Sequence, residues 1–128
     1  MYFDSSMNDK IPIFPLPLVL LPGEKLPLHI FEEKYKKMIE YCLKNNQKFG
    51  IINSKNSDSL VIGCTASIEQ LVGGENDSRE YDILVTGVER FIVKSYNSSE
   101  PYKQAYVKTW NDIDAVSYTH LTLPTMLM

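Results

Sequence analysis

The densest apolar stretch of the sequence runs from Ile11 to Leu43, and its pattern changes near Ile30. Five of the seven prolines fall before that point, at positions 12, 15, 17, 22 and 27. Each proline fixes its φ angle and removes a backbone N–H, so this part cannot be a helix. We therefore expect extended segments at sheet edges or bulges, where a missing donor is harmless. Pro22 and Gly23 mark a turn between two of them.

Beyond Ile30 the apolar residues follow a helical period. One face of the predicted helix carries Phe31, Tyr35, Met38, Ile39, Cys42 and Leu43. The opposite face is expected to be solvated, with i, i+4 charge pairs that join Glu32 to Lys36, Glu33 to Lys37 and Glu40 to Lys44. The pattern thus predicts one amphipathic helix near residues 31–44, ended by Asn45 and Asn46.

After the helix, runs rich in β-branched and aromatic residues alternate with polar segments, which indicates strands and turns. Strands are expected over residues 48–53, 60–72, 81–86, 88–96 and 102–110, with a short extended piece over 26–30. Gly63 marks a bulge or a close backbone approach, and Gly87 a bend in a long ribbon. Many short strands and one helix favour a mainly β (α+β) fold, an antiparallel barrel with a helical insertion.

The two ends of the sequence differ from the part between them. Residues 1–10 are polar and predict a flexible N-terminus, and they lack the basic start and apolar segment of a signal peptide. After Asp114 the charged residues stop, and VSYTHLTLPT resembles a translated sequencing-adapter phrase. We expect residues 11–114 to form one domain that is cut short at its C-terminal end. Residues 115–128, His120 included, are expected to be foreign to the natural protein.

Composition narrows the class of protein. The 128 residues, 44% apolar and 23% charged, suit one globular domain. The net charge of −3 and the absence of a basic stripe interleaved with aromatics argue against nucleic acid as a partner. The apolar run from Leu16 to Leu21 is far shorter than the ~20 residues of a membrane span. We expect a soluble, cytoplasmic protein.

The two cysteines, Cys42 and Cys64, predict neither a disulfide framework nor a zinc site, since no CxxC spacing is present. A cysteine enzyme with His29 as base is a weaker interpretation. Cys42 lies on the apolar helix face and Cys64 in a strand, so both are expected to be buried thiols. Gly73 and Gly74 lack the motifs of a phosphate loop, and no metal or cofactor is expected.

Three phrases of the sequence together resemble the N-terminal substrate-binding domain of the Lon protease family. They are FPL-x-x-V-x-x-PG from Phe14 to Gly23, PLHIFE-x-x-Y from Pro27 to Tyr35, and G-x-ERF from Gly87 to Phe91. Leu21 stands where other members often have Phe. The resemblance covers residues 11–110 and implies a PUA-like β-barrel. The PLHIFE phrase is more similar to stand-alone proteins that contain only this domain than to the full protease.

This resemblance implies a non-catalytic domain that recognises unfolded or misfolded protein segments. Proline-rich strands cannot complete a regular ladder, so they would leave an apolar groove suited to extended peptides. The candidate peptide-binding residues are Leu21, Pro22, Leu26, His29 and Tyr35, and each has packing of the proline-rich strands against the helix as its alternative role. Structural roles are expected for Pro22, Gly23, Phe31, Gly87, Glu89, Arg90 and Phe91. Phe91 and Trp110 are expected in the core.

Two further interpretations stay open. The chain is equally compatible with the N-terminal fragment of a full ATP-dependent Lon protease. It contains neither a Walker A motif nor a serine-lysine protease signature, so this polypeptide is not expected to hydrolyse peptides or ATP. The PUA-like fold class also includes RNA-binding modules, but fold does not settle function and the acidic balance argues against RNA.

Overall fold

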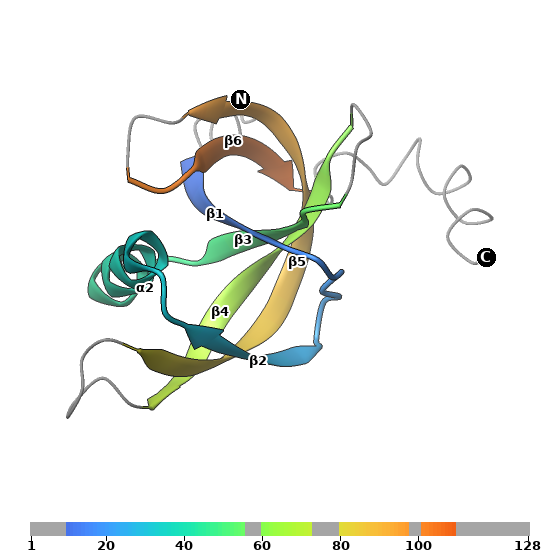
Figure 1. Cartoon of the computed structure of the whole chain (residues 1–128). Coiled ribbons are helices and arrows are strands. Elements are labelled where there is room, and N and C mark those ends of the chain that lie inside the picture. The colour runs from blue at the N-terminus through green and yellow to red at the C-terminus, as the bar shows by residue number, and fades with distance from the viewer. Residues whose placement is uncertain (1–9, 56–59, 73–79, 98–100, 110–128) are drawn as a thin grey trace.

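The structure is a computed structural model that describes residues 10–55, 60–72, 80–97 and 101–109 (Figure 1). In this part of the chain the elements are β1 (Lys10–Leu16), β2 (Lys25–Ile30), α2 (Glu33–Asn45), β3 (Phe49–Asn53), β4 (Ile62–Val72), β5 (Tyr81–Asn97) and β6 (Gln104–Thr109). The mainly β fold with one helix is confirmed. The predictions for residues 1–9, Trp110 and the 115–128 tail lie outside the described residues.

The six described strands form one sheet that closes on itself. Their order is β2-β5-β4-β3-β1-β6, and β6 also pairs with β5. β5 has 17 residues and pairs with two strands along the same edge. Its first part, Tyr81–Thr86, pairs with β2, and its last part, Phe91–Asn97, pairs with β6. The result is a ring of five strands, with β2 attached beside it and α2 to one side (Figure 1).

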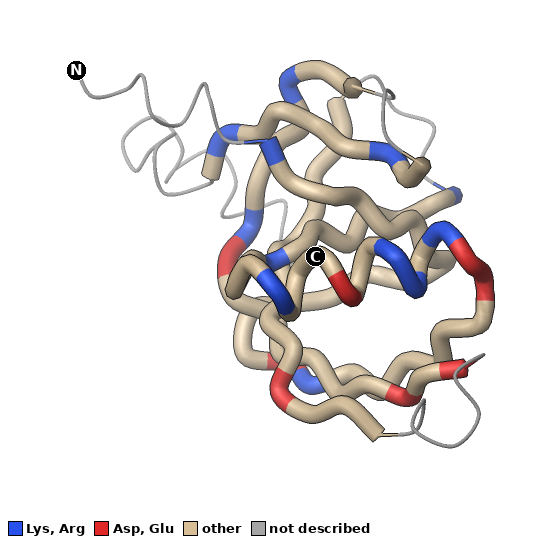
Figure 2. Tube along the Cα trace, turned by 90° about the vertical axis from the view of Figure 1, so that its left-hand side faces the viewer, with Lys and Arg blue, Asp and Glu red and all other residues tan. Residues whose placement is uncertain are grey.

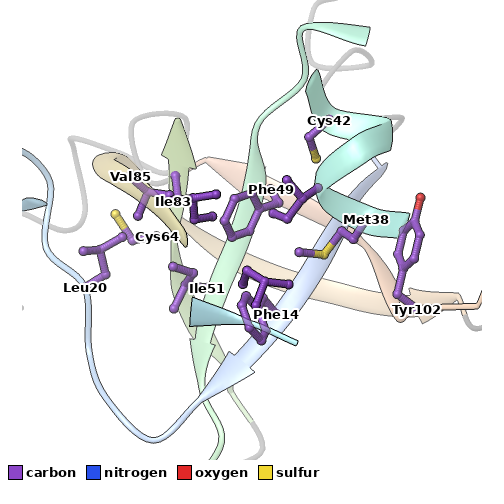
Figure 3. Packing of buried hydrophobic residues seen from close by; sticks show 13 residues of the cluster. Phe14, Leu20, Met38, Cys42, Phe49, Ile51, Cys64, Ile83, Val85 and Tyr102 are labelled. Atoms are coloured by element: carbon purple, nitrogen blue, oxygen red, sulfur yellow. The ribbon is translucent and has the colours of Figure 1, made fainter. Parts of the chain in front are cut away.

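Two clusters of buried side chains lie on opposite faces of the shared strands. Successive residues of a strand point to opposite faces, and the neighbours Ile51 and Ile52 belong to different clusters. The larger cluster gathers β-strand residues against the helix residues Met38, Ile39 and Cys42 (Figure 3). The smaller cluster consists of Ile11, Ile13, Ile52, Phe91, Ala105 and Val107. Phe91 is fully buried, as predicted.

The first strand corrects the expectation that the proline-rich segments lie at sheet edges or bulges. β1 is an interior strand, and it changes partner along its length, from β6 at Lys10–Pro12 to β3 at Ile13–Leu16. The N–H of Ile13 donates to the Lys103 carbonyl at 2.8 Å, on the side away from β3. Along a strand, N–H groups two residues apart point to the same side, so the nitrogen of Pro15 also faces away from β3. The proline therefore removes no hydrogen bond between β1 and β3. β2, which contains Pro27, is an edge strand as expected.

The pairing of β1 with β3 is parallel, whereas every other strand pair is antiparallel in the described sheet. The all-antiparallel expectation is therefore wrong for this pair. β2 and α2 lie between β1 and β3 in sequence, and a connection of that length can return the chain in the same direction.

The helix begins two residues later than predicted. Phe31 precedes it and is 61% exposed, and Glu32 is the N-cap with extended φ and ψ of −80° and 138°. The reason is that β2 continues to Ile30, so the chain needs Phe31 and Glu32 to turn into the helix. Phe31 is therefore not on the buried helix face. Asn46, in the left-handed conformation with φ of 52°, ends the helix as predicted.

Two further positions of the helix differ from the predicted pattern. Leu43 is 45% exposed, whereas Lys36 is buried with 8% exposure. Lys36 lies one turn before Ile39, so its methylene stem extends the apolar face. Its ammonium group reaches the Glu33 carboxylate at 3.4 Å. The face of α2 that contacts the core is thus shifted towards Lys36.

Candidate functional site

The turn at Pro22 and Gly23 docks on Gly87. The Glu24 N–H donates to the Leu21 carbonyl at 3.0 Å, and Gly23 has φ of 85°, as at the third position of a type II turn. Gly23 N–H donates to the Gly87 carbonyl and Gly87 N–H to the Glu24 carbonyl, each at 2.8 Å. A Cβ on Gly87 would overlap the Leu21 carbonyl oxygen. Two of the family-like phrases, far apart in sequence, therefore meet at Gly87.

Glu89 and Arg90 follow this contact on β5. The backbone of Glu89 bonds to the Thr65 hydroxyl in both directions, and both bonds are 3.2 Å long. The register between β4 and β5 shifts here, between Cys64 and Ala66, which places an irregularity beside Gly87. Arg90 lines a pocket of about 240 Å³ under the loop after β1, here called the loop pocket. Its lining residues are Leu18, Val19, Leu20, Leu21, Ile51, Asn53, Ile62, Gly63, Cys64 and Arg90.

A second pocket lies where the end of β1 approaches the junction of β2 and α2. This β1–α2 pocket has a volume of about 340 Å³ and is lined by Phe14, Pro15, Leu16, His29, Ile30, Phe31, Glu32 and Tyr35. The rings of Phe14 and Tyr35 pack with centroids 4.3 Å apart, and those of His29 and Phe31 with centroids 6.0 Å apart. Six of the eight lining residues are apolar or aromatic, so the pocket offers a surface for an apolar side chain.

His29 is held by two carboxylates. Its Nδ1 lies 2.7 Å from Asp82 Oδ1, across the β2–β5 pairing, and its Nε2 lies 3.0 Å from Glu80 Oε1. The hydrogen bond with Asp82 raises the pKa of the imidazole above its ordinary 6.5, with Coulombic attraction to both carboxylates adding to the effect. The side chain is half exposed, so His29 combines a fixed orientation with access to a ligand.

Glu32 and Tyr35 bring polar atoms to the same pocket. Tyr35 is half-buried, and burial, followed by the nearby Glu32 carboxylate, raises the pKa of its hydroxyl. Although Glu32 is the N-cap of α2, its side chain forms no capping hydrogen bond. The pocket therefore has a carboxylate on a lining that is otherwise mostly apolar.

The predicted peptide-binding residues do not form one site. His29 and Tyr35 line the β1–α2 pocket, whereas Leu21 lines the loop pocket. Leu26 packs against the larger core cluster, and Pro22 lies exposed in the turn. Of the five residues, only His29 and Tyr35 therefore line the same pocket.

Sequence reasoning missed the part of the β1–α2 pocket that comes from β1, namely Phe14, Pro15 and Leu16. It also placed Phe31 on the helix and Glu32 on a solvated face. The PLHIFE phrase was the available signal, because it spans His29 to Glu32 without interruption.

The cysteines are buried thiols, as predicted. Burial raises the pKa of the Cys42 thiol to about 12 and also raises the pKa of Cys64. A nucleophilic cysteine needs the opposite shift, so the cysteine-enzyme interpretation loses its nucleophile.

Within residues 10–55, 60–72, 80–97 and 101–109, no group of three His, Cys, Asp or Glu side chains is placed to hold a metal ion. Nor does that part of the chain include a helix long and apolar enough to cross a membrane.

The fold is shared with N-terminal domains of Lon proteins. The chain is similar to the Lon N-terminal domain protein from Xanthomonas campestris, with a TM-score of 0.66 and 25% identity over 93% of this chain and 71% of that one. The N-terminal domain of the Mycobacterium avium complex Lon protease gives a TM-score of 0.65 over 85% of this chain and 59% of that one, at 16% identity. The second likeness concerns the fold alone.

Sequence comparison then identifies the family. The family model of the ATP-dependent protease La (LON) substrate-binding domain matches residues 10–126, and the chain belongs to this family. Curated relatives include the Lon protease of Porphyromonas gingivalis, 26% identical over 86% of this chain, and that of Buchnera aphidicola subsp. Baizongia pistaciae, 30% identical over 77% of it. The chain spans 14% of the length of each.

Proposed function

We propose that this chain is a non-catalytic recognition domain that binds unfolded or misfolded protein segments at the β1–α2 pocket. The observation that carries the proposal is an apolar pocket of about 340 Å³ with Phe31, 61% exposed, on its lining. Small-molecule pockets start at about 300 Å³, so one large side chain of a bound segment fits. Membership of a substrate-binding domain family supports the same function.

The shape of the site favours unfolded over folded partners. Folded proteins bury most of their large apolar side chains, so a pocket that takes up such a side chain selects segments that have lost their packing. Among the described strands β2 pairs only with β5. An extended segment can therefore lie along β2 with an apolar side chain in the pocket, as in other cases of recognition at a sheet edge.

Binding to a permanently unfolded protein tests this proposal. We expect the full chain to bind reduced, carboxymethylated α-lactalbumin and to ignore the native protein. Phe31→Ala should weaken binding about tenfold, because about 1.4 kcal/mol of aromatic contact is lost. Fluorescence anisotropy of the labelled unfolded protein measures the affinity.

Tyr96→Ala is the matched control, since Tyr96 is an exposed aromatic residue on the half of β5 that pairs with β6. It should bind like the unaltered chain. If Phe31→Ala and Tyr96→Ala lose the same affinity, the β1–α2 pocket is not the binding site. If the unaltered chain does not bind the unfolded protein, the proposed function itself is wrong.

The second proposal is that the chain is the N-terminal part of a longer ATP-dependent Lon protease. Its span of 14% of the curated relatives supports this. Reading the source DNA beyond Asp114 tests it, because an in-frame ATPase segment would establish the longer protein. The same reading tests the predicted foreign origin of residues 115–128. A cytoplasmic location and a PUA-like barrel remain part of the proposal in both cases.

The RNA-binding interpretation gains no support from the β1–α2 pocket. Its acidic lining residue, Glu32, would repel phosphate groups.

A further inference from the structure

We infer that the β1–α2 pocket selects unfolded segments in which a large apolar residue has a Lys or Arg close to it in sequence. This inference rests on the proposed function and adds the charge of the substrate to it. It is carried by the carboxylates that surround an apolar pocket, and above all by Glu32.

Carboxylates predominate around the pocket. Figure 2 shows that Asp and Glu gather in the lower part of the molecule, around β2 and the adjoining ends of β4 and β5, whereas α2 carries both signs. Glu32 lines the pocket itself, and Asp82 and Glu80 bond to the lining residue His29. A bound segment that enters from this side meets negative charge first.

The described cations nearby already have contacts. The Lys34 ammonium lies over the Tyr35 ring, 5.1 Å from its centroid, and Lys36 is paired with Glu33. His29 offsets part of the charge of Asp82 and Glu80 when it is protonated. No hydrogen bond or ion pair joins the Glu32 carboxylate to another of the described residues, so Glu32 is the acidic group left for a ligand.

The backbone of Glu32 caps the helix, whereas its carboxylate takes no part in the capping. Its carbonyl oxygen accepts from the N–H groups of Tyr35 and Lys36, each at 3.0 Å, and so begins the helix. Ser, Thr, Asp and Asn are the usual N-cap residues because their side chains bond the first turn. Glu32 forms no such bond, and its carboxylate lies near the Tyr35 hydroxyl, whose pKa it raises. The negative charge is also tolerated there by the helix dipole.

A docked segment removes water from this carboxylate. A desolvated charge is costly unless it is paired. Lys or Arg supplies a charge-assisted hydrogen bond, and its aliphatic stem covers apolar surface beside the pocket. A segment with Glu or Asp at the same place brings two like charges together, so the pocket rejects it by repulsion.

Three labelled decapeptides with the same Phe-Leu centre test this inference, with Lys, Ser or Glu as the residues on both sides of the centre. Anisotropy titrations with the full chain at low salt should give an affinity about tenfold higher for the Lys peptide than for the Glu peptide. The ratio should fall as salt screens the contact.

Glu32→Gln should reduce the Lys-to-Glu ratio to about twofold. Glu89→Gln, which removes the same charge on β5, should leave the ratio unchanged because Glu89 does not line the pocket and its backbone, not its side chain, bonds to Thr65. Far-UV circular dichroism checks that both variants fold.

The outcomes separate the inference from the proposed function. If the three peptides bind with equal affinity, or both variants change the ratio equally, the charge preference is overturned and the apolar recognition stands. If no peptide binds, the proposed function fails and takes the charge preference with it.

Discussion

His29 shows how much one side chain can do in this fold. It lies on the edge strand β2, bonds to Asp82 on the neighbouring strand and to Glu80 just before that strand, and lines the β1–α2 pocket. The same imidazole therefore helps to attach β2 to β5 and presents a polar group to the proposed ligand. Its two roles are linked through its charge.

The charge of His29 makes stability depend on pH. The pKa in the folded protein lies above the ordinary 6.5 because of Asp82 and Glu80. Its contribution to the free energy of unfolding is therefore fully present below about pH 6.5 and is lost as the pH rises through the raised pKa. Urea midpoints measured from pH 5.5 to 9 should show His29→Gln less stable than the unaltered chain at the acid end only.

Asp82→Asn is the companion variant for this titration. This variant removes the main cause of the raised pKa of His29. It should therefore lose most of the pH-dependent contribution of His29 to the free energy of unfolding. A constant gap between the unaltered chain and His29→Gln across the whole range would contradict the assignment.

At the scale of elements, the turn after β1 is fixed by its contact with β5. Two backbone hydrogen bonds join Gly23 and Glu24 to Gly87, and the Leu21 carbonyl lies against the bare Cα of Gly87. The turn has no side chain of Gly87 to avoid, so it lies directly on the strand. One face of the loop pocket is thereby held in place through Leu21.

Alanine substitutions at Gly87 and Gly23 distinguish the cost of a steric overlap from the cost of a strained φ angle. Gly87→Ala should lower the free energy of unfolding by about 3 kcal/mol, because its Cβ overlaps a backbone oxygen that cannot rotate away. Gly23→Ala should cost only about 1 kcal/mol, since the φ of 85° is strained for alanine but nothing lies within 4 Å of the new Cβ. Chemical denaturation measures both, and a reversed order would contradict the docked turn.

The elements themselves were largely predictable from local pattern. The 3.6-residue period located α2, and Asn46 ended it because Asn tolerates the left-handed conformation. Phe31 was misplaced because an apolar residue four positions before Tyr35 satisfies the helical period whether or not the chain is still turning there. The interior position of β1 was missed because its two partners, β3 and β6, are distant in sequence.

The candidate site was predictable only in part, for the same reason. His29 and Tyr35 belong to a contiguous phrase, and both line the β1–α2 pocket. Phe14 reaches that pocket from β1 through a ring contact with Tyr35, 21 positions later in the chain. A contact of this kind depends on how the helix lies against the sheet, and no local pattern records it.

At the scale of the whole molecule, β5 joins the two buried clusters. Ile83 and Val85 lie in the larger cluster and Phe91 in the smaller one, on one continuous strand. A Cβ on Gly50 would lie 2.6 Å from Phe91 Cζ, and one on Gly63 would lie 2.5 Å from it, so the ring fills the space beside both glycines. The two clusters should therefore unfold together.

This coupling is tested by creating a cavity in the smaller cluster and following the exposure of side chains in the larger one. Phe91→Ala should cost about 3–5 kcal/mol. The thiols of Cys42 and Cys64, both in the larger cluster, should become reactive at the same lowered urea concentration at which the far-UV signal is lost. Val88→Ala, at an exposed position of β5, serves as control and should leave the midpoint unchanged. Thiol exposure that stays at the original midpoint would show that the clusters unfold separately.

During synthesis, β1 emerges well before β6, the strand with which it closes the ring. β1 pairs with β6 through Lys10, Ile11 and Pro12, and roughly 90 residues separate the two strands. At synthesis rates of about 5–20 residues per second, the ribosome needs on the order of 5–20 s between them. During that interval the N-terminal end of β1 has no partner on its β6 side. A nascent chain of this domain therefore exposes, for several seconds, the kind of apolar unfolded segment that the finished domain is proposed to bind.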